Sequence, residues 1–475
     1  MAAIITTPFR VLNAENFKED IASAGTSVYL GIGKSDVWSD ATSDLTDTIP
    51  FTPGDHLNDR NDAWSQMQAL KLISAGDVSH VVPRHDYADG QTYEAWDSKD
   101  GDIFDDKFYV ITSEFKVYKC IQKGSGNTAT QPTHTDATIK PTRAQAAAGD
   151  GYRWKYMYTV TTADSEKFLT KSFMPVKTLA ESPTLATTNV NYPQQQSQVA
   201  SRALSTAAGI ERIVIPAGKG GQNYSSSDTF VVTIEGDGSG ASVTDADVTV
   251  TGGAITDIRI NAEGTDYTKA TVTITHGNES GGTAGTGAEA RAVISPSGGH
   301  GTDPVSELGA FFVAINTQLD NSSDEDFTAG NDFRQITLVK NPYSTGTTVA
   351  TAETLKATKY LQLANGQTTS GFVVDQVIQG SVSTAKAYLV EIDSTNRRLY
   401  YYQNEKTGFK AFQGGGSPDT VTGTLPSGGS GVLASSHLGA AEVVAGSGQL
   451  IFLENRDPIS RTASQIEDIK CIIEF

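Results

Sequence analysis

The residues most suggestive of chemistry lie in Gly31–Ser35, a Gly-Ile-Gly-Lys-Ser run that follows an apolar stretch. A lysine and a hydroxyl residue after a glycine form the end of a phosphate-binding loop, where the lysine contacts the phosphates and the hydroxyl binds magnesium. The complete loop also needs a glycine five positions before Gly33, and Val28 occupies that position within the apparent strand. Because the glycine-rich cradle of backbone N–H groups is missing, the sequence does not predict nucleotide binding.

Two histidines, His80 and His85, bracket a Val-Val-Pro-Arg stretch. Two histidines on one helix bind zinc when they are four positions apart, and these are five apart. Pro83 between them excludes a regular helix. No nearby cysteine or glutamate completes a set of ligands. We therefore expect turn or packing histidines.

The acidic run Asp97–Asp106 has the composition of a calcium-binding loop. An EF-hand loop that begins at Asp97 needs an oxygen ligand at its third position and a glutamate at its twelfth. This chain has Lys99 and Phe108 there. A solvated acidic turn is the simpler interpretation, with an irregular cation site as the alternative, and the acidic stretch 321–327 is interpreted in the same way. No metal site and no cofactor site are predicted.

No arrangement of residues predicts catalysis. A glycosidase needs two facing carboxylates, and the 55 acidic residues offer no pair that stands out. The sequence contains no nucleophile elbow, no serine–histidine–aspartate order and no catalytic cysteine context. The chain is therefore predicted not to be an enzyme.

The bulk composition restricts the partners and the compartment. The 475 residues include 36 Lys+Arg against 55 Asp+Glu, and the net charge of −19 repels phosphate backbones, so we expect no nucleic-acid partner. The N-terminus lacks the basic and apolar regions of a signal peptide, and no stretch approaches the ~18 apolar residues of a membrane span. Cys120 and Cys471 are expected to be buried free thiols. These features predict a soluble chain that folds in the cytoplasm, without a membrane partner.

The spacing of apolar residues predicts a mainly β protein with few helices. Short apolar runs alternate with Ser, Thr, Asn, Asp and Gly, which is typical of many short strands joined by turns. One helix is expected from Asn13, as its N-cap, to about Ala24, and another from about Asp59 to Ile73.

Strands are expected at 27–32, 108–112, 115–121 and 152–160. In the last of these, Tyr152, Trp154, Tyr156 and Tyr158 alternate with Arg153, Lys155 and Met157. Side chains alternate between the two faces of a strand, so this pattern predicts a half-buried strand with an aromatic inner face.

Residues 203–297 repeat themselves. The first copy contains the runs 210–215, 221–224, 231–234 and 240–243, and the second contains 255–260, 264–267, 271–274 and 287–290. Tyr224 and Tyr267 occupy equivalent positions, 43 residues apart. A repeat of this length predicts a supersecondary unit that buries its face against its copy, so we interpret 203–297 as an inserted glycine-rich β-module.

A second insert is expected at 357–440, where short strand-like runs precede a Gly/Ser-rich stretch. The character of residues 1–202 returns at 298–356 and at 441–475. The predicted organisation is one core domain in three segments, interrupted by the β-repeat module and by a small antiparallel β-domain, with the core's last strands at the C-terminus.

Seven segments of the predicted core follow one another in an order seen in a known family. They are 29–39, the helix around Trp64, 81–86, 117–121, 150–158, 332–342 and 448–459. In this order they resemble the gene-product-eight baseplate wedge subunits of T-even-like contractile-tailed phages (myoviruses). The resemblance covers about 1–200, 305–345 and 445–475 and leaves both inserts outside. The stretch 298–309 is similar to a junction in marine, cyanophage-type relatives.

The resemblance implies a layered β-sandwich core with short helices in its loops and a structural role in the architecture and assembly of the baseplate. It also implies a homodimer that contacts other wedge proteins, located in the virion tail and assembled in the host cytoplasm. The matching motifs contain the candidates for structural or interface residues, which are Trp38, Trp64, Arg84, Asp86, Trp154, Arg334, Asn341, Glu454, Asn455 and Arg456.

Arg334 and Arg456 can each bind a carboxylate through two parallel hydrogen bonds. Because both lie beside apolar strands, we expect links between core strands, and contact with a neighbouring subunit is the alternative. Two competing functions are recognition of host-surface carbohydrate through the inserts and a depolymerase-like tail enzyme. The ordered core motifs favour the wedge protein.

Overall fold

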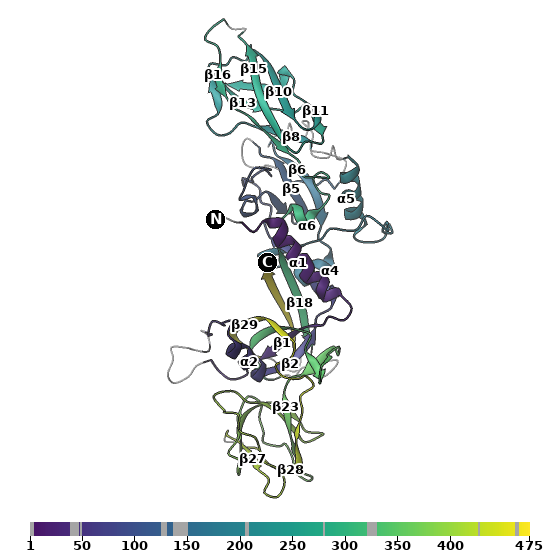
Figure 1. The fold of residues 1–475 in the computed structure, drawn as a ribbon, viewed down its shortest axis with the longest axis vertical. Helices are drawn as coiled ribbons and strands as arrows, with labels where there is room; N and C mark the ends of the chain where they lie inside the picture. The colour runs from purple at the N-terminus through teal and green to yellow at the C-terminus, as the bar shows by residue number, and fades with distance from the viewer. Residues whose placement is uncertain are drawn as a thin grey trace. The chain divides into compact units, whose positions relative to one another are not determined.

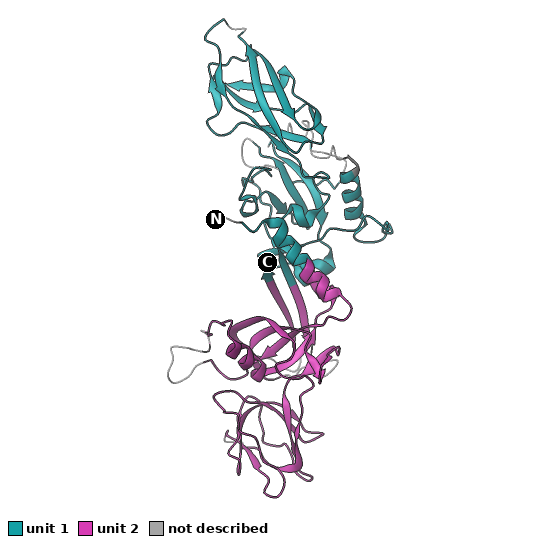
Figure 2. Ribbon diagram, in the orientation of Figure 1, with its two compact units in different colours: residues 1–15, 79–314, 473–475 teal, residues 16–78, 315–472 magenta. Residues whose placement is uncertain are grey.

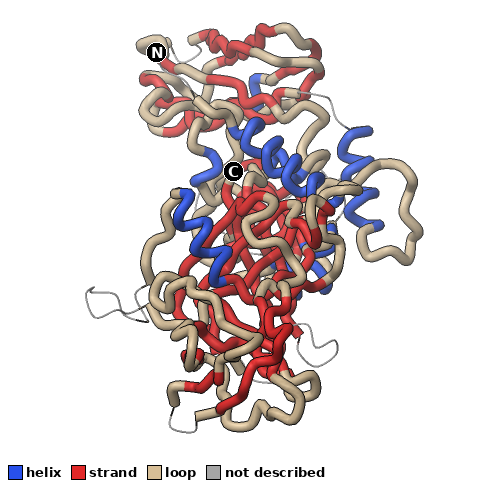
Figure 3. The backbone as a smooth tube through the Cα atoms, turned by 60° about the horizontal axis from the view of Figure 1, so that its bottom comes forward, coloured by secondary structure: helices blue, strands red, loops and turns tan. Residues whose placement is uncertain are grey.

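The computed structural model describes residues 4–38, 47, 50–124, 131–135, 151–204, 209–278, 281–320, 330–425, 428–460 and 465–475. Strands dominate these residues, and the helices are short (Figure 1, Figure 3). The predicted fold class, mainly β, is confirmed. The acidic stretch 321–327 lies outside the described residues.

The chain forms two compact units (Figure 2). Unit 1 consists of residues 1–15, 79–314 and 473–475, and unit 2 consists of residues 16–78 and 315–472. Residues 203–297 belong to unit 1 and residues 357–440 belong to unit 2. The division into one core and two inserts remains a prediction.

Both helices that were predicted from the sequence differ from the helices in the structure. They are α1 (Thr7–Ala22), α2 (Leu57–Gln66), α4 (Thr162–Phe168), α5 (Tyr192–Leu204) and α6 (Pro304–Glu307), with single 3₁₀ turns η1 (Ala75–Asp77), η2 (Ile103–Asp105) and η3 (Asp245–Asp247). Helix α1 begins six residues before Asn13, which is therefore not its cap. Pro8 suits the first helical turn because its missing N–H would be unpaired there, and buried Val11 and Ala14 extend the packed face toward the N-terminus.

The second predicted helix is wrong beyond Gln66. Residues Met67–Leu72 form strand β2, which pairs antiparallel with β1 (Val28–Gly33) on one side and with β22 (Thr354–Lys356) on the other. Met67 to Leu70 are buried, so the strand does not show the alternation of a half-exposed strand. A short apolar run of this kind cannot be distinguished from a helix by periodicity alone, and pairing with two neighbours decides it.

Unit 1 contains a three-stranded antiparallel sheet of β4 (Tyr109–Ile111), β5 (Lys116–Gln122) and β6 (Arg153–Thr159). Strand β3 (Val78–Pro83) pairs with β7 (Phe173–Val176) in a four-stranded sheet of order β30-β18-β3-β7, where β18 is Phe312–Asp320 and β30 is Ile466–Glu474. Unit boundaries fall within β18 and β30.

The aromatic strand β6 corrects the half-buried prediction. Tyr152, Trp154 and Tyr156 pack together in one buried cluster, as predicted for a shared face, but Tyr158 packs in another cluster with Met157. In the pairing with β5, Tyr158 and Tyr156 lie opposite two successive residues of β5. The register therefore shifts, and Met157 between the two tyrosines is left unpaired. Such a bulge turns the following side chain to the other face. Lys155 and Met157 are also buried, so β6 is covered on both faces.

The two sequence repeats interlock. The first copy supplies β8 (Ile210–Val214), β9 (Gly220–Gln222), β10 (Thr229–Gly236), β11 (Ser239–Ser242) and β12 (Val248–Thr251), and the second supplies β13 (Ala254–Ile258), β14 (Ala262–Thr265), β15 (Ala270–Gly277), β16 (Thr286–Ala288) and β17 (Arg291–Ile294). Their pairs are β8-β17, β9-β16, β10-β15, β11-β14 and β12-β13. Each of these pairs joins a strand of one copy to a strand of the other, so the copies form one structure.

Each of the two equivalent tyrosines likewise packs against the other copy of the repeat. Tyr224 of the first copy packs on Gly285 of the second, and its hydroxyl accepts the Ala288 N–H at 3.3 Å. Tyr267 of the second copy packs on Gly238 of the first, and its hydroxyl accepts the Ala241 N–H at 3.4 Å. Both rings are buried in the module core. Each copy therefore packs its tyrosine against the other copy, and this produces the predicted burial of one copy against the other.

Unit 2 contains a five-stranded antiparallel sheet and a closed barrel. The sheet has the order β22-β2-β1-β19-β29, where β19 is Asp332–Lys340 and β29 is Gln449–Ser460. The barrel consists of β23 (Lys359–Leu363), β24 (Val377–Gly380), β25 (Lys386–Asp393), β26 (Arg398–Tyr402), β27 (Thr420–Gly423) and β28 (Ser430–Gly439). A small hairpin, β20 (Tyr343–Thr345) and β21 (Thr348–Val349), follows β19.

Candidate functional site

The residues that resemble a phosphate-binding loop form hydrogen bonds with other residues of unit 2. Lys34 follows β1, has a left-handed backbone (φ 60°) and is buried. Its Nζ donates to Asp36 Oδ2 at 3.0 Å and to Gln66 Oε1 at 3.1 Å. Burial lowers the pKa of Lys34, and the negative charge of Asp36 opposes this effect. The lysine therefore already has an anionic partner.

The same turn is bound to the barrel by Tyr402. The backbone N–H groups of Ser35 and Asp36 donate to the Tyr402 hydroxyl oxygen at 3.1 and 3.0 Å. That hydroxyl in turn donates to Asp36 Oδ1 at 2.9 Å, and Asn404 Nδ2 donates to the same oxygen at 3.2 Å. Lys406 Nζ lies 3.1 Å from Asp36 Oδ2. The backbone donors that a phosphate would use are thus occupied by a side chain of the barrel.

Arg334 is the most extensively paired of the candidate residues. Its Nε and Nη2 donate to the two carboxylate oxygens of Asp47, each at 2.8 Å, and Nη1 donates to the carbonyl of Ser35. Asp332 Oδ2 lies 3.2 Å from Nη2. These hydrogen bonds lower the pKa of Asp47. Only 3% of Arg334 is exposed, and its partners are all in unit 2.

The hydrogen bond between Trp38 and Arg456 involves the Arg456 backbone rather than its guanidinium. Trp38 Nε1 donates to the Arg456 carbonyl at 2.8 Å, and Lys34 Nζ lies 4.7 Å from the centre of a Trp38 ring. Arg456 Nη1 is 3.9 Å from Glu454 Oε1, and its Nε has no hydrogen-bond partner in the described chain. Arg456 therefore does not form the two-bond carboxylate pair that Arg334 forms.

Three other candidates in unit 2 hold strands and loops together. Trp64 is buried in the core that contains Met67 and Leu70. Asn341 has a left-handed backbone (φ 51°), and its Oδ1 accepts the Ser27 N–H at 2.8 Å. Asn455 Oδ1 accepts a hydrogen bond from Gln335 Nε2 at 2.9 Å.

The remaining candidates lie in unit 1. Arg84 Nε donates to Asp86 Oδ1 at 2.8 Å, and Nη1 donates to the Thr170 carbonyl at 2.9 Å. Trp154 is buried, and its ring stacks on Tyr152 at 5.9 Å between centroids. The candidate residues are therefore divided between the two units, and in unit 2 Trp38, Arg334 and Arg456 lie together, since Asp47 Oδ1 accepts from both the Trp38 N–H and Arg334 Nε and Trp38 Nε1 donates to the Arg456 carbonyl. Their interface roles remain predictions.

The sequence's histidine and acidic motifs have internal contacts. His80 Nδ1 lies 3.2 Å from the Ala310 carbonyl, and His85 packs on Tyr109 at 5.1 Å between ring centroids. Arg291 Nη1 donates to Asp97 Oδ1 at 2.8 Å. Among the described residues, no group of three or more His, Cys, Asp or Glu side chains is placed to hold a metal ion. Cys120 and Cys471 are buried free thiols, as predicted.

A buried charged cluster in unit 1 was not predicted. Lys119, fully buried in β5, donates to Glu307 Oε2 at 2.9 Å and lies 4.5 Å from the centre of a Trp96 ring. His300 Nε2 lies 2.5 Å from Glu211 Oε2. Although burial opposes ionisation, the charge of Lys119 and the His300 ring, whose Nδ1 lies 3.7 Å from Glu307 Oε2, lower the pKa of Glu307 to about 2. A lysine within an otherwise apolar strand was the one sequence signal for this cluster.

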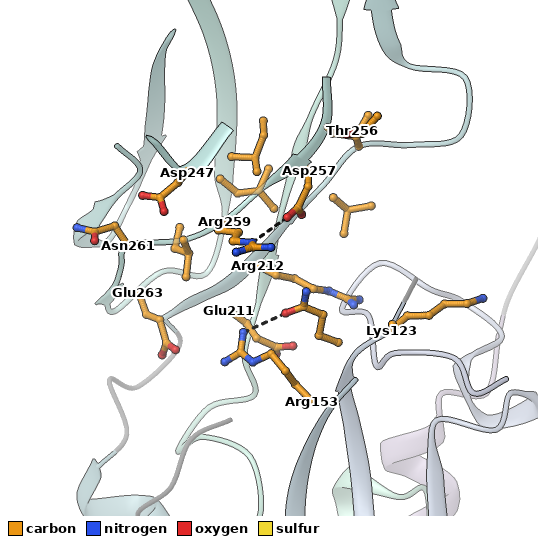
Figure 4. Close-up of a pocket in the computed structure, with 17 residues that line it drawn as sticks. Lys123, Arg153, Glu211, Arg212, Asp247, Thr256, Asp257, Arg259, Asn261 and Glu263 are labelled. Atoms are coloured by element: carbon orange, nitrogen blue, oxygen red, sulfur yellow. Dashed lines mark hydrogen bonds and ion pairs between the residues drawn. The ribbon is translucent and has the colours of Figure 1, made fainter. Parts of the chain in front are cut away.

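Beside this cluster lies a polar pocket of about 740 Å³ (Figure 4). Its wall combines Gln122, Lys123, Gly124 and Arg153, from the ends of β5 and β6, with residues of the repeat module that include 211–215, 256–261, Asp247 and Glu263. Figure 4 shows charged side chains of both signs around it. Sequence reasoning missed this pocket because its walls come from segments far apart in the chain.

These features define a class of protein: a mainly β protein in which the described charged clusters connect strands and turns of the same chain. Among the helices that the structure describes, none combines the length and the apolar character needed to cross a membrane.

The model of a family described as "Phage-Gp8: Bacteriophage T4, Gp8" matches residues 3–140. The predicted family is confirmed over this stretch, which is the part of the chain that the family model matches. The matched residues include β1 and β2 of unit 2 and β3, β4 and β5 of unit 1. No curated protein matches the chain. The cyanophage-type assignment remains a prediction.

Proposed function

We propose that the chain is a non-enzymatic structural subunit that builds the wedge of a contractile-tail baseplate, as a homodimer in contact with other wedge proteins. The family match over residues 3–140 carries this proposal, because that family is a structural baseplate component. The proposal places the protein in the virion tail after assembly in the host cytoplasm.

The start of α1 offers a surface for subunit contact. Phe9 and Leu12 are 51% and 49% exposed, three positions apart on one helix, and Ile4 and Ile5 before the helix are 85% and 68% exposed. Contiguous exposed apolar side chains are typical of protein–protein contacts. All four residues lie in the stretch that matches the family.

Light scattering on the purified chain, at several concentrations, tests the dimer. We expect a concentration-independent mass of twice 50.3 kDa, and we expect Phe9→Glu to shift the mass toward the monomer because it places a charge in the apolar contact. Val231→Glu, at an apolar residue that is 57% exposed in the repeat module, is the matched control and should leave the mass unchanged. A monomer for the unmodified chain would contradict the dimer, and a trimer would favour a fibre or spike.

Recognition of host-surface carbohydrate is the second candidate function. The polar pocket supports it, since most of the lining residues come from the repeat module. A glycan array probed with the full chain tests it, and the absence of binding to every glycan would count against it.

A further inference from the structure

The barrel of unit 2 has a polar pocket of its own, with a volume of about 480 Å³. This barrel pocket is lined by residues 362–365, at the end of β23, by residues 395–398, in the turn from β25 to β26, and by residues 434 and 435 of β28. Two of the lining residues are arginines, Arg397 and Arg398, and none of the described residues in this wall is acidic. In a chain with a net charge of −19, this wall is a local exception that favours an anion.

The charge of Arg397 is not balanced by an ion pair with any carboxylate of the described chain. Its side chain makes one hydrogen bond with a described residue, from Nη2 to Asn365 Oδ1 at 3.1 Å. Its Nε is buried without a partner in the described chain. A guanidinium has five N–H donors, and a neutral amide does not compensate its charge.

Arg398 differs from Arg397 because its charge already has neighbours. It lies opposite Asp393 in the pairing of β25 with β26, and the charge of Asp393 acts on it. Its guanidinium carbon is 4.4 Å from the centre of the Tyr360 ring. The unmatched charge of the barrel pocket is therefore that of Arg397.

The backbone of Arg397 gives a second reason to assign a role to its side chain. This residue is left-handed (φ 56°), a conformation that suits glycine or asparagine and is uncommon for a long side chain. The turn is held by Asp393, whose two carboxylate oxygens accept the N–H and the Nδ2 of Asn396, each at 2.8 Å. Because the turn does not need the guanidinium, an arginine in this position points to a function in the pocket.

The rest of the wall indicates what carries the anion. Asn365, Thr395 and Ser435 add an amide and two hydroxyls to the two arginines, and all three residues are exposed. Amide and hydroxyl side chains both donate and accept hydrogen bonds, as the hydroxyl groups of a sugar do. This combination suits a ligand that carries hydroxyls beside its negative charge.

The apolar part of the wall is small. Leu363 is only 1% exposed, which leaves Ala364 and Ala434 as the accessible apolar side chains. The wall therefore offers little to the apolar residues of a peptide. None of the described lining residues is aromatic, so the wall offers no surface on which a nucleotide base would stack. The volume of 480 Å³ is within the ~300–1,000 Å³ of ligand pockets.

We propose that the barrel pocket binds an acidic sugar unit, with the sugar's carboxylate held by Arg397 and its hydroxyls by the amide and hydroxyl side chains of the wall. A guanidinium can form two parallel hydrogen bonds with a carboxylate, which gives geometry as well as charge. The inference rests on the second candidate function, carbohydrate recognition, and gives it a site and a class of sugar. It is independent of the wedge role, because all the lining residues lie outside the stretch 3–140 that matches the family.

Binding of glucuronic acid to the full chain at neutral pH tests the pocket, with glucose as the neutral sugar. In protein labelled with ¹⁵N-arginine, glucuronic acid should shift the side-chain Nε–H resonance of Arg397, which is identified by its loss in Arg397→Gly. Glucose should need at least tenfold higher concentration for the same shift. No shift with glucuronic acid, or an equal response to glucose, would overturn the proposal.

Two other anions distinguish an acidic sugar from other sources of negative charge. Acetylated and amidated glutamate presents the carboxylate of a peptide, and inorganic phosphate is a simple oxyanion. Both should bind at least tenfold more weakly than glucuronic acid, because they lack the ring hydroxyls that the wall would hold. Binding of either as tightly as glucuronic acid would overturn the sugar assignment.

Arg397→Gly separates binding from folding. Glycine adopts the left-handed backbone without strain, so this variant should keep or raise the midpoint of denaturant unfolding while it weakens glucuronic acid binding at least tenfold in ligand-detected NMR. Lys386→Gln removes an exposed positive charge of β25 outside the wall and should leave the affinity within threefold of wild type. If Arg397→Gly does not fold, Arg397→Asn replaces it, because asparagine also tolerates this backbone. A lower unfolding midpoint with unchanged affinity would mean that Arg397 is structural and would overturn the proposal.

Other results separate this inference from the functions proposed above. A glycan array that shows binding to neutral glycans alone, unaffected by Arg397→Gly, would overturn the barrel pocket and leave carbohydrate recognition standing. The dimer mass, measured on the same protein, tests the wedge role by itself.

Discussion

Asp375 shows how a single partly buried side chain couples this protein to pH. It lies in a barrel loop with a left-handed backbone (φ 61°), and its Oδ2 accepts the Asp332 N–H at 3.0 Å. Burial raises the pKa of Asp375 to about 6, and the hydrogen bond from Asp332 opposes that increase. The folded state therefore holds this proton more tightly than the unfolded chain does.

Asp375→Asn should raise stability at neutral pH. Between the ordinary pKa of 3.8 and about 6 the unfolded state loses the proton while the folded state retains it, so the free energy of unfolding falls with rising pH across this window and stays reduced above it. The size is at most about 3 kcal/mol. Asparagine tolerates the left-handed backbone and keeps an acceptor for Asp332. Denaturant unfolding should show a gain at pH 8 and little change at pH 4.

Asp266→Asn is the matched control for this prediction. Asp266 has a similar left-handed backbone (φ 63°) but is exposed, so its replacement should have the same small effect at both pH values. A stability difference between Asp375→Asn and wild type that does not change from pH 4 to pH 8 would contradict the assigned cause.

Residue chemistry was easier to predict than residue partners. The sequence indicated that Arg334 could bind a carboxylate through two hydrogen bonds, and its geometry with Asp47 has this form. Nothing in the local sequence pointed to Asp47, which is 287 positions away. Lys119 and Glu307 are 188 positions apart and were missed for the same reason. The spacing of residues along one element indicates which kind of interaction a side chain can form, whereas the fold determines the partner with which it forms that interaction.

At the scale of elements, strands that pair locally were predictable and tertiary choices were not. The runs at 115–121 and 152–160 form β5 and β6 within one or two residues, because alternation and turn residues mark them. The run at 67–72 became a strand because β1 and β22 flank it. In the repeat module the equivalence of Tyr224 and Tyr267 was visible, but the exchange of strands between the copies was not.

Gly285→Ala should destabilise the repeat module. A methyl group at Gly285 would overlap the Tyr224 ring, although the backbone there needs no glycine. Overpacking of this kind costs about 1–3 kcal/mol, which outweighs the roughly 0.4–1 kcal/mol that a glycine-to-alanine change otherwise contributes. The measurement is denaturant unfolding monitored by tyrosine fluorescence.

The other copy of the repeat has an equivalent glycine, which allows the same test. Gly238→Ala should act on Tyr267 with a similar loss, because Gly238 has the equivalent contact. Gly416→Ala faces open space in the barrel unit and is the neutral control. Unchanged stability in both module variants would mean that the tyrosines are not seated on these glycines.

For the whole molecule, the net charge of −19 opposes the association of two copies in the proposed dimer. Two copies with this charge would repel each other in the proposed dimer, and salt would screen that repulsion because the Debye length falls from ~10 Å at 0.1 M to ~3 Å at 1 M. A contact made by the exposed apolar residues Phe9 and Leu12, as proposed, would depend little on charge pairs. Long-range repulsion and short-range apolar burial should therefore determine the dimer affinity together.

The dimer dissociation constant should fall severalfold when sodium chloride is raised from about 0.05 M to about 0.5 M at pH 8, because the attraction stays while the repulsion is screened. Light scattering measures it at each salt concentration over a dilution series that extends below the concentrations at which the dimer mass is constant. Near pH 4.8, the isoelectric point, the net charge approaches zero and the salt dependence should largely disappear, which is the internal control. A dissociation constant that rises with salt at pH 8 would instead indicate that ion pairs between subunits dominate the interface.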